Sequence, residues 1–433
     1  FFSLALPRML KYHTGTMENR EKAFFTNNGG MLLYGLSAVL IGPTLPGMIS
    51  TFGLSLSQGG LISAAQNMGG FLGALLTLWI ADRVSHPKSA LASFLLLAVA
   101  LFAVGVAPVY LILLFAFGAT GFFIRILDVM LNAHTGELAG PRSGRRLSML
   151  HLFFSVGAFV GPVVARALMS GGLSWDGVYR SVGIGYVLAA LLAIPLLRAH
   201  LRMEAPGGGE AGPPETRSPG TRATELRPNG SVGSDESERG AWTAASLVPV
   251  VILGMALFFY AIHQVGLTSW VPYFLESSRG AGANAASIGL SAYWVGIIAG
   301  RFLMSRIVDS VGESVILVFG AVLSAATTLG AVLLPTVWLA QGLLVVAGIT
   351  SGATIPLAYS FGFFFLPRRT GSVTAVMALL MLVGRILGPW AIGGVADRAG
   401  LVLAMTIPGW ALLFTAASVA VVWALSRRRV AGR

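Results

Sequence analysis

The 433-residue chain contains no cysteine, and only 11% of its residues are charged. The absence of cysteine excludes a disulfide-stabilised scaffold and leaves the redox compartment undetermined. A soluble globular domain carries about 25% charged residues, so this chain lacks the charged surface that a cytosolic enzyme or a disordered protein would need. With 55% hydrophobic residues and a mean hydropathy of +0.79, the composition predicts a polytopic membrane protein.

Apolar stretches follow one another along almost the whole chain. Because a helix needs about 20 apolar residues to cross the hydrocarbon core of a bilayer, each stretch predicts one transmembrane helix. The twelve predicted spans are 29–49, 58–80, 89–107, 109–133, 149–170, 178–197, 246–270, 287–308, 314–334, 337–365, 372–395 and 402–425.

A polar segment at about 199–245, rich in Gly, Pro, Ser, Thr, Arg and Glu, separates the sixth span from the seventh. Such a composition cannot bury enough apolar surface to become ordered, so it predicts a flexible linker between two halves. Residues 1–16 are interpreted as an extension ahead of a native start at Met17. The predicted organisation is an N-terminal segment (1–28), a six-helix bundle (29–198), the linker (199–245), a second six-helix bundle (246–425) and a basic tail (426–433).

The formal net charge of +12 comes from 29 basic and 17 acidic residues. If the N-terminus is cytoplasmic, 21 of the basic residues fall in cytoplasmic segments and two, Arg279 and Arg398, fall in outer loops. This bias predicts a multi-pass protein of the cell membrane with both termini and the linker in the cytoplasm. It accounts for the basic excess without a nucleic-acid partner, since no platform of aromatic and basic residues accompanies it.

An internal repeat relates the two halves at an offset of 227 positions. Six Gly, Asp and Pro residues match at this offset, in two separate pairs of spans. The matched pairs are Gly69 and Gly296, Gly73 and Gly300, Asp82 and Asp309, Gly157 and Gly384, Gly161 and Gly388, and Pro162 and Pro389. Parallel repeats of this kind are typical of transporters in which two bundles rock against each other. The predicted fold class is therefore an all-α membrane protein with twelve transmembrane helices in two pseudo-symmetric six-helix bundles.

With these features the chain resembles the major facilitator superfamily over nearly all of 17–425. The segment 81–88 (ADRVSHPK) is similar to the signature of the loop between the second and third helices, and 306–312 (RIVDSVG) is its counterpart in the second half. The resemblance implies a cytoplasmic latch or gate formed by Asp82, Arg83, Asp309 and Arg301. Asp82 and Asp309 could instead only cap or orient helix ends.

Four segments (128–132, 144–162, 260–273 and 291–301) are similar to the fucose-permease type of sugar:proton symporter. Those symporters carry an acidic residue in the first helix, whereas 29–49 contains none. Relatives often have Glu where this chain has Gln264. The resemblance implies proton-coupled transport of a sugar or a sugar-like solute.

The ionisable residues inside the spans are the first candidates for a functional site, because charges there are costly and usually face a cavity. Arg125, Asp128 and Asn132 lie at i, i+3 and i+7, so they share one helix face. Asp128 is the only carboxylate well inside a predicted span. We therefore expect Asp128 and Arg125 to couple a proton to the conformational change; the alternative is a static neutral pair.

Polar side chains in other spans are candidate substrate ligands. Arg385 corresponds in the repeat to Ala158, so symmetric packing does not explain a cation there. It needs an anion, a cluster of carbonyl groups or a substrate, and Asp128 is one alternative partner. The other candidates could each be ordinary packing residues. The predicted substrate-binding residues are Asn132, His151, Arg385, Gln264, His263, Gln66, Asn67, Trp294 and Tyr260.

No catalytic, metal-binding or nucleotide-binding motif occurs in the sequence, which leaves an ion gradient, rather than a cofactor, as the driving force. We therefore predict a monomeric, proton-coupled secondary transporter of a small polar solute in the lipid bilayer, and not an enzyme. A drug or metabolite:proton antiporter and a flippase for a lipid or a lipid-linked sugar remain alternatives on the same fold.

Overall fold

The computed structural model describes residues 5–80, 83–139, 143–204 and 244–431, and no strand occurs in these ranges. The helices of the first half are α1 (Ala5–Ala38), α2 (Ile41–Phe52), α3 (Leu56–Ile80), α4 (His86–Val104), α5 (Tyr110–Ala139), α6 (Ser143–Ser170) and α7 (Trp175–Glu204). Those of the second half are α9 (Ala244–Arg279), α10 (Ala283–Val311), α11 (Glu313–Leu333), α12 (Val337–Ser351), α13 (Thr354–Phe365), the short 3-10 helix η3 (Pro367–Arg369), α14 (Thr370–Ala399), α15 (Leu401–Ala404) and α16 (Ile407–Ala431).

Eleven of the described helical stretches are long and apolar enough to cross a membrane, and the bent pair of α1 and α2 makes a twelfth. The twelve predicted spans are thus confirmed. Two linker-flanking helices run further than the hydropathy indicated, because α7 continues to Glu204 and α9 already begins at Ala244. Most of the predicted linker, 205–243, lies outside the described residues.

The first span is divided by a bend of 42° between Ala38 and Ile41. Pro43 lies directly after the break and has no N–H group to donate to the carbonyl oxygen of Val39. A proline ring also collides with the carbonyl group four residues earlier, which kinks or breaks a helix and accounts for the bend at this point.

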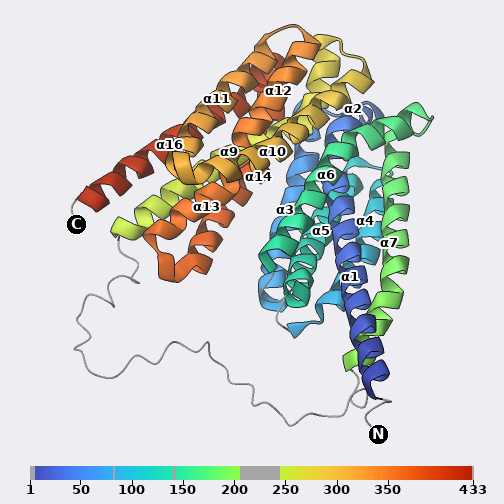
Figure 1. Ribbon diagram of the computed structural model, residues 1–433. Coiled ribbons are helices and arrows are strands. Elements are labelled where there is room, and N and C mark those ends of the chain that lie inside the picture. The colour runs from blue at the N-terminus through green and yellow to red at the C-terminus, as the bar shows by residue number, and fades with distance from the viewer. Residues whose placement is uncertain (1–4, 81–82, 140–142, 205–243, 432–433) are drawn as a thin grey trace.

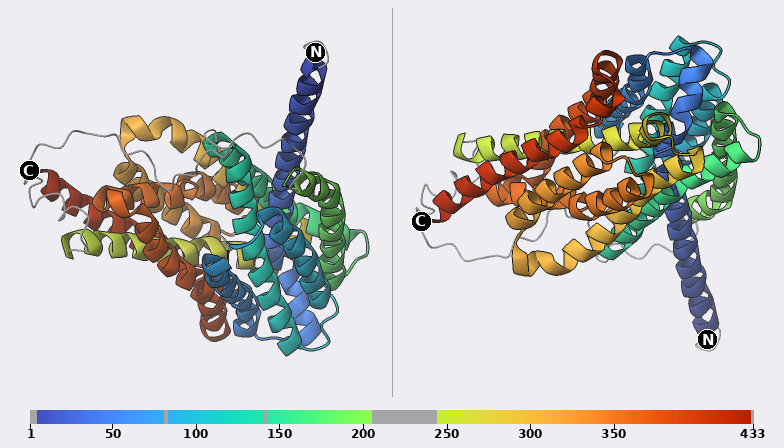
Figure 2. Two further views of the ribbon diagram at one scale, coloured as in Figure 1. Left: turned by 90° about the horizontal axis from the view of Figure 1, so that it is seen from below. Right: turned by 90° about the horizontal axis from the view of Figure 1, so that it is seen from above.

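The helices form two bundles, one from each half of the chain, which lie side by side in perpendicular views (Figures 1 and 2). Four pairs of helices connect the bundles: α3 with α14, α6 with α10, α2 with α9 and, less extensively, α2 with α10. Figure 1 shows the bundles close together near α2 and diverging toward the ends of α7 and α9 that flank the linker. We call the diverging end the linker side and the opposite end the far side.

Helix packing repeats at the same offset as the sequence. A Cβ atom on Gly69 would lie 1.8 Å from the carbonyl oxygen of Gly118, and one on Gly296 would lie 2.1 Å from that of Val345. Gly118 and Val345 are themselves 227 positions apart. Both contacts need a residue without a side chain, because the backbones of the two helices touch there. The pseudo-symmetry therefore extends to the contacts between individual backbone groups.

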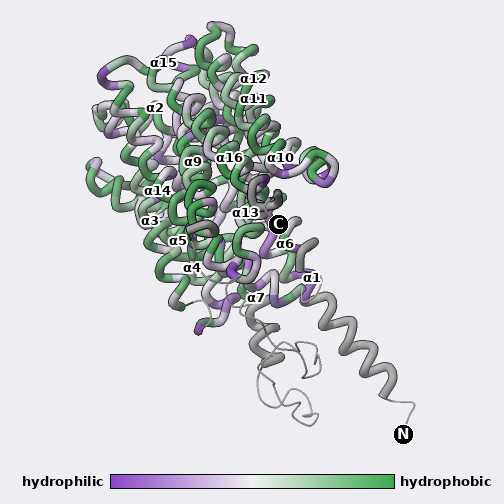
Figure 3. The backbone as a smooth tube through the Cα atoms, turned by 90° about the vertical axis from the view of Figure 1, so that its left-hand side faces the viewer, coloured by the Kyte–Doolittle hydropathy of each residue, from purple (hydrophilic) through white to green (hydrophobic). Residues whose placement is uncertain are grey.

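The outer faces of both bundles are apolar. Figure 3 shows hydrophobic colouring along most of the helix lengths, with hydrophilic residues gathered mainly near helix ends. Large apolar side chains such as Leu78, Phe115 and Trp338 are exposed on these faces. An apolar surface of this extent needs a nonpolar surrounding, so the outer faces suit the interior of a bilayer.

Candidate functional site

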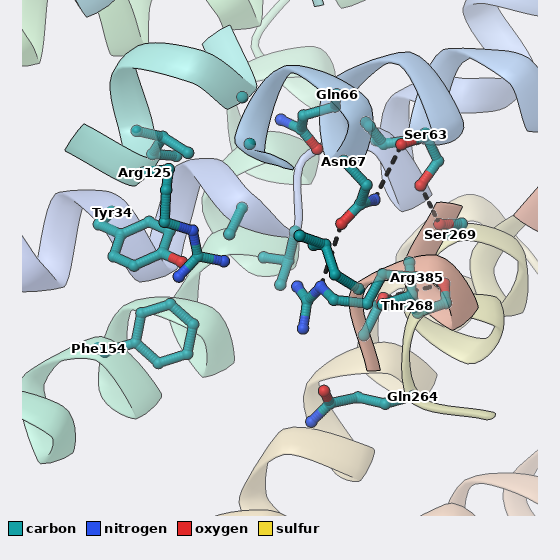
Figure 4. A pocket seen from close by; sticks show the side chains of 18 of the residues that line it. Tyr34, Ser63, Gln66, Asn67, Arg125, Phe154, Gln264, Thr268, Ser269 and Arg385 are labelled. Atoms are coloured by element: carbon teal, nitrogen blue, oxygen red, sulfur yellow. Dashed lines mark hydrogen bonds between the residues drawn. The ribbon is translucent and has the colours of Figure 1, made fainter. Parts of the chain in front are cut away.

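A cavity of about 210 Å³ lies between the two bundles, lined by residues of both (Figure 4). The first bundle contributes side chains from the bent first span, α3, α5 and α6. The second contributes side chains from α9, α10, α13 and α14. Pockets for drug-sized ligands measure about 300–1,000 Å³, so this cavity suits a small solute.

Three arginines line this cavity: Arg125 from α5, Arg301 from α10 and Arg385 from α14. We call them the cavity arginines. Figure 4 shows the guanidinium groups of Arg125 and Arg385 facing the same space from opposite bundles. Nε of Arg385 donates to Oδ1 of Asn67 on α3 at 3.1 Å. The partner of Arg385 among the described residues is thus an amide, and the alternative ion pair with Asp128 is not formed there.

Arg301 was expected at a cytoplasmic gate, and this assignment is wrong in its location. NH1 of Arg301 donates to Oγ of Ser155 on α6 at 3.0 Å, and its Nε donates to the carbonyl oxygen of Gly352 at 3.3 Å. The physical reason is helical register. Arg301 follows Trp294 by seven residues, which is about two turns, so both side chains point to the cavity from one face of α10.

Asp128 makes its closest contacts within its own helix. NH1 of Arg125 donates to Oδ2 of Asp128 at 2.8 Å, and Nδ2 of Asn132 donates to Oδ1 at 3.0 Å. Asp128 and Asn132 do not line the cavity; they reach it through Arg125. Asn132 is thus placed as a partner of the carboxylate, one step removed from the site where it was expected to bind substrate.

Amide side chains form a polar part of the cavity wall. Gln66, Asn67 and Gln264 all line it, as the sequence predicted. Nδ2 of Asn67 donates to the carbonyl oxygen of Ser63 at 2.8 Å, which holds its Oδ1 toward Arg385. Nε2 of Gln264 donates to the hydroxyl of Tyr260 at 3.2 Å. These amides present both donors and acceptors to the cavity.

Aromatic rings form another part of the cavity wall. The rings of Tyr34 and Phe154 lie 4.7 Å apart, and those of Phe154 and Trp294 lie 5.9 Å apart in an edge-to-face arrangement. The side chain of Trp294 is 5% exposed, and its Nε1 has no hydrogen-bond partner among the described residues. The sequence predicted Trp294 as a cavity residue but not Tyr34 or Phe154. The one sequence feature that could have indicated Phe154 is its position next to the polar Ser155.

Three other predicted substrate ligands do not line the cavity. Tyr260 and His263 are buried behind its wall, where Nε2 of His263 lies 3.3 Å from the hydroxyl of Tyr293. Of the two, Tyr260 holds Gln264 by accepting its hydrogen bond. His151 is exposed on α6, and Asp128 and Arg301 act on it electrostatically. All three remain near the site, but none of them is placed to touch a solute in this cavity.

Of the four residues of the predicted latch, Arg83, Asp309 and Arg301 lie within the described residues. Asp82 lies outside the described residues. The guanidinium carbon of Arg83 lies 4.9 Å from the ring centre of Trp79 in the same segment. Within the described ranges no ion pair joins Arg83 to Asp309.

The far side is closed by hydrogen bonds between the bundles. Asp397, near the end of α14, accepts hydrogen bonds from the backbone N–H groups of Leu56 and Ser57, both at 2.8 Å. Nearer the cavity, Oγ of Ser269 donates to Oγ of Ser63 at 3.0 Å. A carboxylate at a helix N-terminus satisfies free N–H groups and complements the helix dipole. Asp397 was missed from the sequence, since a helix-end acid looks like any exposed charge.

The polypeptide resembles known proteins over most of its length. Residues 29–389 match the family profile described as Major Facilitator Superfamily. Protein TsgA homolog of Erwinia tasmaniensis is 23% identical over 296 residues, 67% of this chain and 67% of that protein. Protein TsgA homolog of Yersinia pestis (strain Pestoides F) is 21% identical over 295 residues, 67% and 66% of the two chains. The chain thus spans about two thirds of the length of these curated relatives.

Two solved structures share the arrangement of helices. A bacterial homolog of the human lysosomal transporter Spinster, inward-facing and unoccupied, has a TM-score of 0.70 and 17% identity, covering 94% of this chain and 97% of that one. A D-xylose-proton symporter has a TM-score of 0.68 and 17% identity, covering 92% and 96%. At such identities the likeness extends to the fold alone.

Proposed function

Since this chain belongs to the Major Facilitator Superfamily, and is a transporter rather than an enzyme, we propose that it moves a small polar solute by alternating access. In this proposal the protein is a monomer in the cell membrane, and its linker side faces the cytoplasm. The conformation described above is then the inward-facing one. A proton gradient, rather than a bound cofactor, drives the accumulation of the solute.

The observation that carries this proposal is the cavity between the two repeats. Side chains of both bundles line it, and contacts between the bundles close the far side while the bundles diverge on the linker side. Rocking the repeats about this cavity would expose the same side chains to the opposite face of the membrane. The size of the cavity and its amide groups favour a sugar-sized polar solute over an apolar drug.

The pair of Asp128 and Arg125 supports proton coupling. Asp128 is only 15% exposed, and Arg125 extends from it into the cavity wall. Protonation of Asp128 would remove the charge that holds Arg125 and free this guanidinium to rearrange at the cavity. A proton would thereby alter the solute site directly.

Flux assays in proteoliposomes test the proposal. The purified full chain should accumulate a radiolabelled solute from a panel of neutral sugars, sugar acids, sugar phosphates and nucleosides when an inward proton gradient is imposed. Accumulation should collapse when a protonophore removes the gradient, whereas counterflow at equal pH should persist. Flux of no panel member above that of protein-free liposomes would overturn the proposed function.

A further inference from the structure

The cavity carries more positive charge than its surroundings neutralise. Of its lining residues in the described ranges, three are arginines and none is Asp or Glu. One carboxylate, Asp128, lies just behind the wall and pairs with Arg125 at 2.8 Å. Arg301 and Arg385 form no ion pair within the described part of the chain. Two guanidinium groups are therefore without a counter-charge at the solute site.

Neither of these cations belongs to the repeated packing of the fold. Arg301 and Arg385 correspond at the offset of 227 to Ala74 and Ala158, so the first half places alanines at both positions. An arginine at the middle of a membrane helix costs about 2.5–3.5 kcal/mol on insertion scales. The packing that the two halves share therefore does not account for this cost in the second half.

Both guanidinium groups keep unused hydrogen-bond donors. Each guanidinium has five N–H donors. Arg385 donates from Nε to Asn67, and Arg301 donates from Nε to Gly352 and from NH1 to Ser155. All of these acceptors are neutral. The remaining N–H groups have the planar arrangement that matches an oxyanion through two parallel hydrogen bonds.

Neutral groups of the same cavity complement the rest of such a solute. The indole N–H of Trp294 is a buried donor without a partner in the described structure, at the cavity wall. The rings of Tyr34 and Phe154 lie beside it and offer an apolar surface for the C–H face of a hydroxylated ring. Gln66 and Gln264 add amide donors and acceptors for hydroxyl groups.

We propose, resting on the transport function proposed above, that the solute is a sugar-sized organic anion whose oxyanion is bound by Arg301 and Arg385. A neutral sugar would leave both cations uncompensated, and a cationic solute would be repelled by them. The oxyanion belongs to a carboxylate or a phosphate monoester. Both groups present two oxygen atoms that accept parallel hydrogen bonds from one guanidinium group. Trp294 and the aromatic rings bind the hydroxylated remainder.

Isothermal titration calorimetry of the purified full chain tests this with three ligands of matched size: D-glucuronate, D-glucose 6-phosphate and D-glucose. At least one anion should bind ten-fold or more tightly than glucose, and the preferred anion identifies carboxylate or phosphate. Arg301→Gln and Arg385→Gln should each weaken that anion ten-fold or more. Arg306→Gln is the matched control, because Arg306 lies on the same helix over the ring of Phe302, outside the cavity lining.

Thermal unfolding without ligand shows whether each variant is folded, and Arg301→Lys and Arg385→Lys replace any variant that is not. The lysine variants keep the positive charge but lose the planar pair of N–H donors. They should therefore bind the anion with an affinity between those of the parent and the glutamine variants. Glucose binding as tightly as both anions, or undiminished anion binding in the variants, would overturn the anionic solute. Proton-driven glucose flux in that case would leave the proposed transport function intact.

Discussion

Asp397 and Ser57 occupy positions that the repeat relates to Ser170 and Asn284. Asp397 accepts a hydrogen bond from the backbone of Ser57 at 2.8 Å, and Oγ of Ser170 lies 3.5 Å from Oδ1 of Asn284. In the second pair Arg166 adds a hydrogen bond from Nε to the same oxygen at 2.8 Å. In both places the end of a helix in one bundle is hydrogen-bonded to the start of a helix in the other. The far side is thus closed at two positions that the repeat relates.

Replacing Asp397 by alanine should favour the state that is open on the far side. The loss of a helix cap costs about 0.5–2 kcal/mol, which is about a 2–30-fold shift in population. The chain has no cysteine, so a reporter thiol introduced at the cavity by Thr268→Cys is unique. A membrane-impermeant maleimide added to the far side of oriented vesicles should label this thiol faster in the Asp397→Ala background.

The matched control for that experiment is Asp176→Ala. Asp176 is an acid at the start of α7, on the same side of the membrane, and it pairs with Arg180 of its own helix at 2.6 Å. Its loss should leave the labelling rate unchanged. Equal labelling rates in the Asp397→Ala and Asp176→Ala backgrounds would contradict a closing role for Asp397.

Gly393 and Gly394 provide a second test of far-side closure. A Cβ atom on Gly393 would lie 2.2 Å from the carbonyl oxygen of Leu56 in the other bundle, whereas one on Gly394 meets nothing within 4 Å. Gly393→Ala should therefore destabilise the closed far side by about 1–3 kcal/mol, the usual cost of overpacking. The same thiol assay should show faster labelling for Gly393→Ala, and Gly394→Ala should behave as the parent. Identical rates for the two variants would mean that the interface yields at this point.

Asp128→Asn should abolish proton-driven accumulation and preserve counterflow. The asparagine keeps the shape of the side chain but cannot take up and release a proton, so protons no longer control whether the charge of Arg125 is neutralised by its partner. Uptake with and without a pH gradient, measured in proteoliposomes, separates the two activities. Asp176→Asn serves as the control. Full gradient-driven accumulation by Asp128→Asn would show that Asp128 only holds α5 together.

The segment 205–243 should be replaceable by a Gly/Ser sequence of the same length. Its composition is typical of a flexible coil, whose reach depends on length rather than on particular residues. Transport by the substituted protein should match that of the parent at equal membrane insertion. A clear loss of flux would indicate a specific contact made by the natural sequence, and shortening the Gly/Ser segment stepwise would then measure the reach that is needed.

Hydropathy was enough to predict the spans, because a span depends on local composition. Matched Gly, Asp and Pro positions were enough to predict the repeat. The cavity could be predicted only in part. Arg385 and Gln264 stood out as polar groups in apolar spans, whereas Tyr34 and Phe154 did not, since an aromatic residue facing lipid and one facing a solute look alike in sequence. Arg301 was assigned to a gate from the family resemblance, whereas its two-turn spacing from Trp294 places it on the cavity face of the helix.

The bend in the first span has a mechanical consequence. Val39 and Ile41, on either side of the break, both line the cavity. Before the break α1 packs mainly on α6 of its own bundle, whereas beyond the break α2 contacts α9 and α10 of the other bundle as well as helices of its own. The bend of the first span therefore lies in the cavity wall. A solute that contacts Val39 or Ile41 would therefore lie where the span changes direction, between a helix packed in its own bundle and one that also contacts the other bundle.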